Sequence, residues 1–185
     1  MRNFSAPVID ILAGIPSVVY GIWGVLTLVP FVRFISENIF GTPSTGYCVL
    51  SAGLVLAVMV VPIITHVSVE VLRSVPRELR DVSLALGATK WQTVKKVVLR
   101  KALPGMTASV ILGVSRAFGE TMAVLMVAGN VAKIPDSIFS PAYPLPALIA
   151  SNYGEMLSIP LYDSILLFAS LLLLVVVIAF NAAAK

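Results

Sequence analysis

Three long runs without a charged side chain constrain this chain more than any other feature of its sequence. Residues 11–32, 38–69 and 164–184 contain no Asp, Glu, Lys or Arg. Each run is long enough for an α-helix of about 20 residues to cross a bilayer. Only 12% of the residues are charged and 58% are hydrophobic, whereas a soluble domain has about 25% charged residues. The composition excludes a soluble enzyme, a disordered chain and a secreted disulfide scaffold, and it predicts an integral membrane protein.

The expected fold class is all-α integral membrane, with four transmembrane helices. We place the four spans at residues 8–32, 48–69, 104–130 and 161–182. The first of them contains Gly14, Pro16, Gly21 and Gly24, so it is predicted to be kinked. Such breaks persist in a bilayer only where neighbouring protein or a water-lined cavity satisfies the freed backbone groups. This span is therefore expected to pack inside a bundle.

The distribution of Lys and Arg predicts the orientation. Ten of the 13 basic residues lie at the two ends of the chain or in segment 70–103, and only two lie in segments 33–47 and 131–160. Basic residues concentrate in cytoplasmic loops, so both termini and segment 70–103 are predicted to be cytoplasmic. Segment 131–160 is then a proline-rich outer loop, in which residues 146–157 are compatible with a short helix. A rigid loop and a partner-docking segment both remain open.

Segment 70–103 contains several helix start and stop signals. Pro76 is suited to a first helical turn, Gly87 to the end of that helix, and Thr89 begins a capping box. Pro104 makes the preceding residue a helix boundary. These signals predict two short amphipathic helices joined by a corner at Gly87. Such helices would lie on anionic lipid headgroups or dock on a cytosolic protein, and the pattern leaves both open.

Few side chains suit metal or nucleotide chemistry. The chain has one cysteine, Cys48, and one histidine, His66, so no Cys/His zinc cluster is possible. It also lacks a glycine-rich phosphate loop of the kind that binds ATP. No cofactor and no catalytic residue are expected. A membrane-embedded enzyme acting on lipids is disfavoured, because the nine acidic residues are scattered.

Parts of the sequence resemble a known family. Residues 81–87, followed by Leu103-Pro104-Gly105, resemble the "EAA" coupling loop of ABC importer permeases. Residues 15–21 (IPSVVYG) and 116–124 (RAFGETMAV) resemble the phosphate-specific permease subunits of the PstC type. The resemblance covers the chain from about residue 5 to its end. In this chain Asp81-Val82-Ser83 stands at the EAA triplet and Arg100 stands where related loops often have proline. Family members usually have further spans upstream, so the chain is expected to be a truncated or partial member.

The resemblance implies a membrane-spanning permease subunit of an ATP-driven importer for inorganic phosphate. Residues 1–185 would form a single, partial permease domain in the plasma (inner) membrane of a prokaryote. The implied partners are a second permease subunit of the PstA type, separate ATP-binding cassette subunits that hydrolyse the ATP, an extracytoplasmic phosphate-binding protein, inorganic phosphate and membrane lipid, with no nucleic acid. The residues implied to form the ATPase coupling loop are Glu78, Asp81, Ala85, Gly87, Ala88 and Trp91.

Two charges lie inside the third predicted span. A charged residue at mid-bilayer costs about 2.5–3.5 kcal/mol on insertion scales, so Arg116 and Glu120 require an explanation. On a helical wheel one stripe spans an arc of about 80° and holds Gly105, Ser109, Gly113, Arg116 and Glu120. That stripe is predicted to face the bundle. It holds either an internal Arg–Glu pair or a substrate path made by Arg116, Glu120 and Ser109, in which the guanidinium meets phosphate.

Two further alternatives remain at the level of function. Tungstate and molybdate permeases share the coupling loop, so another oxyanion is possible. A non-transporting membrane scaffold whose cytoplasmic loop recruits a cytosolic partner would show the same spans and charge asymmetry.

Overall fold

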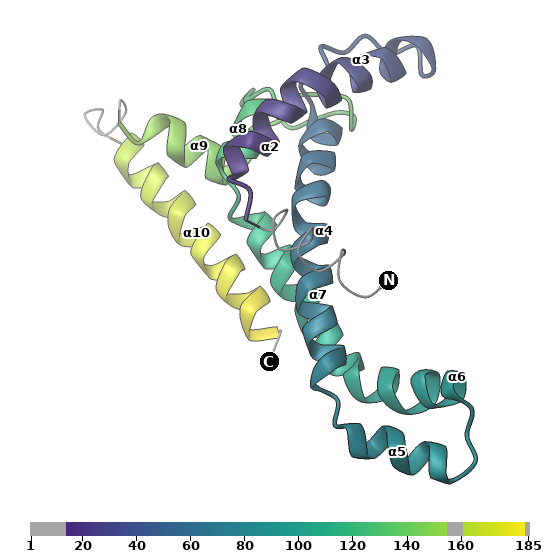
Figure 1. Cartoon of the computed structure of the whole chain (residues 1–185). Helices are drawn as coiled ribbons and strands as arrows, with labels where there is room; N and C mark the ends of the chain where they lie inside the picture. The colour runs from purple at the N-terminus through teal and green to yellow at the C-terminus, as the bar shows by residue number, and fades with distance from the viewer. Residues whose placement is uncertain (1–13, 155–160, 184–185) are drawn as a thin grey trace.

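The described part of the chain is almost entirely helical. The computed structural model describes residues 14–154 and 161–183, where the only β-type pairing is an isolated bridge between Gly129 and Ala142. Four helices in these ranges are long and apolar enough to cross a membrane (Figure 1): Ser17–Asn38, Val49–Ser74, Lys90–Phe118 and Tyr162–Ala183. The all-α membrane fold and the number of spans are thus confirmed, while the bounds of three spans differ from prediction; the second ends at Ser74 and not at residue 69.

The first span is interrupted by a π-helical segment. It consists of α2 (Ser17–Trp23), the π-helical segment η1 (Gly24–Leu28) and α3 (Val29–Asn38). Pro30 lies at the start of α3 and has no N–H to donate, and the widened turn precedes it directly. The irregularity expected from the sequence is therefore a local π-helical turn. The span ends six residues beyond the predicted limit of residue 32, and the predicted start at residues 8–13 lies outside the described residues.

The third span begins earlier than predicted. The short α6 (Lys90–Thr93), the π-helical η2 (Val94–Val98) and α7 (Leu99–Phe118) form one helix from Lys90 to Phe118. The boundary expected at Pro104 is wrong, because the helix continues through it. Val98 and Ala102 are only 5% and 2% exposed and pack with Val71 and Leu72, so burial holds the helix just before Pro104 against the preceding span. The second of the two short helices predicted for segment 70–103 is therefore the extension of a candidate membrane span.

The third span also ends earlier than predicted. The helix stops at Phe118, and the amides of Gly119 and Glu120 donate to carbonyls three residues earlier, those of Arg116 and Ala117. The chain then turns and starts a separate helix, α8 (Met122–Val127). This correction removes Glu120 from the helical stripe on which the sequence placed it.

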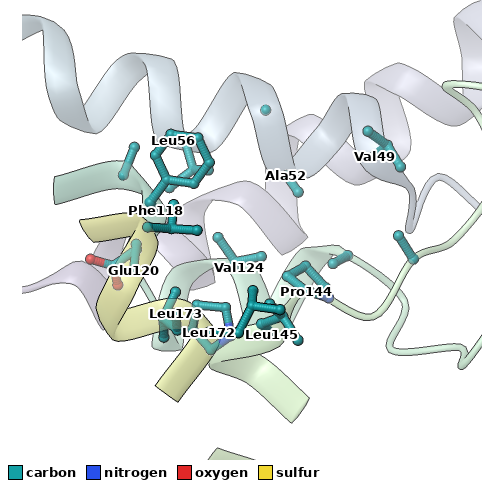
Figure 2. A pocket seen from close by; sticks show the side chains of 16 residues that line it. Val49, Ala52, Leu56, Phe118, Glu120, Val124, Pro144, Leu145, Leu172 and Leu173 are labelled. Atoms are coloured by element: carbon teal, nitrogen blue, oxygen red, sulfur yellow. The ribbon is translucent and has the colours of Figure 1, made fainter. Parts of the chain in front are cut away.

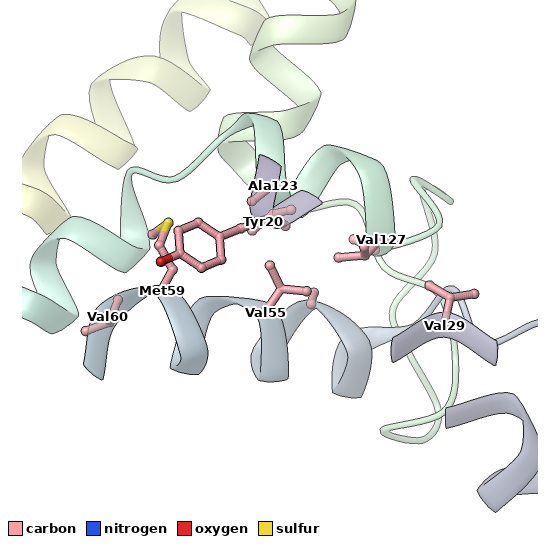
Figure 3. Close-up of a cluster of buried hydrophobic side chains, with 10 residues drawn as sticks. Tyr20, Val29, Val55, Met59, Val60, Ala123 and Val127 are labelled. Carbon is pink, nitrogen blue, oxygen red and sulfur yellow. The ribbon is translucent and has the colours of Figure 1, made fainter. Parts of the chain in front are cut away.

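A buried core joins the first two spans to α8. Tyr20 of α2, Val55 and Met59 of α4 (Val49–Ser74), and Ala123 and Val127 of α8 meet there (Figure 3). A Cβ placed on Gly24 would lie 2.6 Å from Cγ2 of Val55, and one on Gly21 would lie 2.6 Å from Sδ of Met126. Glycine is thus required for these close helix contacts, as is typical of membrane bundles.

The central pair of the fold is α4 and α7, which run side by side (Figure 1). A Cβ on Gly105 would lie 2.6 Å from Cγ1 of Val71, and one on Gly113 would lie 2.5 Å from Cγ1 of Ile64. The hydroxyls of Ser68 and Ser109 are hydrogen-bonded at 2.8 Å between these two contacts. The prediction that the small-residue stripe faces the bundle is confirmed for Gly105, Ser109 and Gly113.

The outer segment is bonded to the start of α4. The amides of Val49 and Leu50, which lack partners within their own helix, donate to the carbonyls of Ser140 and Ile138. The Ser44 hydroxyl donates to the carbonyl of Phe139 at 2.9 Å. These contacts favour a rigid connection over residues 137–142. A short helix, α9 (Leu145–Asn152), follows and confirms the helix expected near residues 146–157.

The last span, α10 (Tyr162–Ala183), slants across the bundle from α9 toward α7 (Figure 1). The rings of Phe118 and Phe180 lie 4.7 Å apart between their centroids. Within α10 only Leu166 and Ala169 are buried. Most of its apolar surface is therefore available to lipid or to further protein.

Candidate functional site

The break between α7 and α8 determines how the two intramembrane charges are placed. Arg116 lies in the last turn of α7 and is exposed, and Glu120 lies in the turn after it and is half-buried. The carboxylate of Glu120 accepts a hydrogen bond from the amide of Ala123 at 3.4 Å. Among the described residues no ion pair joins Arg116 to Glu120. The alternative of an internal Arg–Glu pair therefore has no support in this structure.

Glu120 lines an apolar cavity between the spans. The cavity has a volume of about 400 Å³ and is bounded by α4, the end of α7, α8, α9 and α10 (Figure 2). Its other lining residues are apolar, including Leu56, Phe118 and Leu173. A carboxylate in such surroundings is costly unless a cation or a hydrogen-bond donor accompanies it. This cost sets the residue apart from ordinary packing positions.

Ser109 differs from the other two residues of the predicted substrate path. It is only 2% exposed, its hydroxyl is bonded to Ser68, and it also donates to the carbonyl of Met106 at 2.7 Å. Its described contacts thus join α4 to α7. Sequence reasoning missed Ser68, although a hydroxyl on a neighbouring apolar span is a signal for such a contact.

The hairpin formed by α5 (Arg77–Ala85) and α6 has the corner that the sequence predicts. The helix α5 is followed by Gly87 with φ +83°, and Thr89 and Gln92 form the expected capping box. The amide of Ala88 donates to the carbonyl of Ser83, which closes the end of α5. Gly87 supplies a left-handed conformation that other residues adopt only with strain.

Apolar side chains are exposed at the tip of this hairpin. Leu86 is 83% exposed and Trp91 is 72% exposed, on either side of the Gly87 corner. Of the residues predicted for the coupling loop, Ala88 is half-buried and the following are exposed: Glu78, Asp81, Ala85, Gly87 and Trp91. Large apolar side chains exposed together with charges are typical of a protein-docking surface.

One contact of the hairpin was missed by sequence reasoning. The guanidinium of Arg80 donates from Nη2 to the carbonyl of Leu72 at 2.9 Å, across the junction between α5 and α4. In the sequence, the basic residues of this segment serve only to predict its side of the membrane, and no sequence signal distinguishes Arg80 from the other basic residues.

Metal chemistry has no basis in the described ranges. Residues 14–154 and 161–183 contain no group of three His, Cys, Asp or Glu side chains that could hold an ion. Cys48 is fully buried and contacts the Ser51 hydroxyl at 3.6 Å.

Comparisons with known proteins agree with this architecture. The sequence model of a family described as "Binding-protein-dependent transport system inner membrane component" matches residues 1–185. A probable ABC transporter permease protein, YqgH, of Bacillus subtilis is 46% identical over 80% of this chain and 47% of its own length. The phosphate transport system permease protein PstC of Xylella fastidiosa is 38% identical over 97% of this chain and 59% of its own.

Two further comparisons extend this result. A probable PstC of Methanocaldococcus jannaschii is 36% identical over 93% of this chain and 58% of its own length. The chain thus spans about half to three-fifths of the length of these relatives. Among solved structures, an inward-facing MetNI methionine ABC transporter matches with a TM-score of 0.63 at 24% identity, over 96% of this chain and 69% of the other. At that identity the likeness concerns the fold alone.

Proposed function

The chain belongs to the family of inner membrane components of binding-protein-dependent transport systems, and from that premise we propose that it is a permease subunit of an importer for inorganic phosphate. The substrate rests on one observation, the similarity to relatives named phosphate transport system permeases over 93–97% of this chain. As a family member it is a transport subunit of the inner membrane and not itself an enzyme.

The substrate contact is proposed for Arg116 and Glu120. A guanidinium offers paired donors that match phosphate oxygens and stays charged when buried. Glu120 would balance Arg116 when no anion is present and limit how tightly phosphate is held. For Ser109 we propose a supporting role, since its hydroxyl holds α7 against α4.

The exposure of Arg116 supports a second permease subunit as partner. A guanidinium facing lipid is costly, and Arg116, in the last turn of α7, is exposed in the single chain. A partner permease of the PstA type that covers this face would enclose the charge in a path between the two subunits. Phosphate would then be delivered from outside by an extracytoplasmic binding protein.

The hairpin at the other end supports docking of an ATPase. We propose that separate ATP-binding cassette subunits hydrolyse the ATP and contact the exposed tip around Leu86, Gly87 and Trp91. The exposed apolar side chains of Leu86 and Trp91 at this tip support a protein partner, and the hairpin lies at the end of α4 (Figure 1). Segment 70–103 would thus be cytoplasmic, as would both termini.

Reconstitution of the complex tests this proposal. Proteoliposomes that contain the chain, its partner permease, the ATPase and the binding protein should take up phosphate and hydrolyse ATP faster when phosphate is present. Molybdate or tungstate as the stimulating anion would indicate the alternative oxyanion permease. Recruitment of the ATPase with no anion-stimulated hydrolysis would instead indicate a membrane scaffold.

A further inference from the structure

The cytoplasmic hairpin is attached to the membrane spans by two different connections. On one side, α6 and η2 run into α7 without interruption. On the other side, α5 is separated from α4 by Val75 (ψ 120°) and Pro76 (ψ 140°), both outside the helical conformation. Among the described residues no backbone hydrogen bond crosses this junction. The junction between α4 and α5 is therefore a hinge, whereas the one between α6 and α7 is continuous.

Arg80 bridges this hinge. Its Nη2 donates to the carbonyl of Leu72 at 2.9 Å, from the first half of α5 to the last turn of α4. The last four carbonyls of a helix have no partner within it, and a cation is favoured at that end. The hydroxyl of Ser74 donates to a second of these carbonyls, that of Val71, at 2.8 Å. Arg80 thus acts on α4 as a terminal cap donated by the next helix.

The side chain of Arg80 is enclosed at this point. Its Nε is buried and has no hydrogen-bond partner. Next to the hinge, a cluster of Val75, Val98 and Ala102 packs against Val71 and Leu72. Leaving a guanidinium N–H unsatisfied is costly, and the bond from Nη2 to Leu72 offsets part of this cost.

The other described polar contact of α5 points away from α4. The hydroxyl of Ser83 is hydrogen-bonded to that of Thr93 at 3.0 Å, which ties α5 to the continuous arm of the hairpin. In the described residues, the bond from Arg80 is the side-chain hydrogen bond that ties α5 to α4. Removing it would leave α5 with no described side-chain hydrogen bond to α4, so that the angle at Val75 and Pro76 is held less firmly.

We propose that Arg80 is a positioning residue that fixes the angle of α5 on α4, so that displacement of the hairpin is transmitted to the second membrane span as well as to the third. The fixed angle follows from the contacts of this chain alone. Its use in transport rests on the proposed function, in which an ATPase docks on the hairpin.

Spin-label distances in the full chain, held in lipid nanodiscs, test the fixed angle. One label pair, at Val61 and Val82, joins α4 to α5 across the hinge, and a control pair, at Val61 and Lys95, joins α4 to the continuous arm; all three positions are exposed. Loss of a hydrogen bond from a charged donor shifts an equilibrium by about tenfold. Arg80→Met should therefore broaden the first distance distribution and leave the second unchanged, with Arg80→Lys intermediate.

The matched control is Arg77→Met, since Arg77 is an exposed cation one turn earlier in α5. It should leave both distributions unchanged. Equal distributions for Arg80→Met and the unmodified chain would overturn the proposal. Broadening of both pairs would overturn it too, because Arg80 would then support the folding of the whole hairpin.

A second measurement, in the reconstituted complex, addresses transmission. Arg80→Met should lower the phosphate transported per ATP hydrolysed while the ATPase remains bound, and Arg77→Met should not. A mobile α5 with an unchanged ratio would overturn the role in transmission. Failure of the unmodified complex to transport phosphate would contradict the proposed function and leave the spin-label result intact, so the two failures are distinguishable.

Discussion

At the scale of single residues, Arg116 is the side chain whose replacement is most informative. Arg116→Lys keeps the charge and removes the planar fork, so a bidentate phosphate contact would weaken whereas a simple charge balance would not. We expect phosphate uptake by the reconstituted complex to fall by about tenfold, the loss typical of a hydrogen bond to a charged group. The protein should remain inserted at normal abundance.

Arg33 provides the matched control for this variant. It forms an exposed ion pair with Glu37 at 2.9 Å, and exposed pairs contribute about 0–1 kcal/mol. Arg33→Lys should therefore leave uptake unchanged. Normal transport by the double variant Arg116→Met with Glu120→Leu would contradict a phosphate contact, since an apolar pair can replace charges that serve structure alone.

The placement of Glu120 marks the limit of what the sequence predicts at this scale. A helical wheel assumes a continuous helix, and that assumption holds for Ser109 and Gly113 and fails after Phe118. Glycine alone does not predict the break, because Gly105 and Gly113 lie within the same helix. The turn at Gly119 redirects α8 onto α2, a long-range contact that no local pattern contains.

At the scale of elements, the contact between α4 and α7 is sensitive to any side chain at Gly113. A Cβ there would lie 2.5 Å from Cγ1 of Ile64 and 2.9 Å from Cγ1 of Val60. Overpacking of this kind costs about 1–3 kcal/mol. Gly113→Ala should therefore lower the thermal stability of the purified protein in detergent.

A second glycine of the same pair of helices is the control. Nothing lies within 4 Å of a Cβ placed on Gly53, so Gly53→Ala should be neutral or slightly stabilising, as glycine is the poorer helix former. Equal melting temperatures for the Gly113 and Gly53 variants would show that α4 and α7 are not packed as described.

The Gly87 corner carries a prediction about partner binding. Gly87 has φ +83°, which a β-branched residue resists strongly and asparagine tolerates. Gly87→Val should keep the protein in the membrane and reduce recovery of the ATPase in a pull-down by about tenfold, with Gly87→Asn closer to wild type. Equal recovery of the ATPase by the valine variant would contradict a docking role for this corner.

Local signals predicted the hairpin well and the ends of the third span poorly. The capping box at Thr89 and the corner at Gly87 depend only on residues close to them in the chain, so the local sequence is enough to predict both. Pro62 and Pro104 both lie inside membrane helices. Proline thus ends helices less reliably here than in water, because neighbouring protein can stabilise the interrupted turn of a membrane helix.

At the scale of the whole molecule, the two ends of the bundle differ in charge and construction. One end carries the hairpin of α5 and α6, within a segment that contains eight of the 13 basic residues. The other end carries α3, α9 and the rigid outer connection over residues 137–142 (Figure 1). Most of the basic residues thus lie at the same end of the bundle as the hairpin. This arrangement supports a cytoplasmic hairpin and an outer connection on the opposite side.

This division predicts the accessibility of two positions in intact cells. Lys90 lies at the hairpin and Asp136 at the outer connection, and both are exposed. The native Cys48 is fully buried, so it should not react in the folded protein. A membrane-impermeant maleimide should label Asp136→Cys in intact cells and label Lys90→Cys only after the membrane is opened. Of the four candidate spans, only Lys90–Phe118 lies between the two positions, so labelling of both from outside would mean that this helix does not cross the membrane.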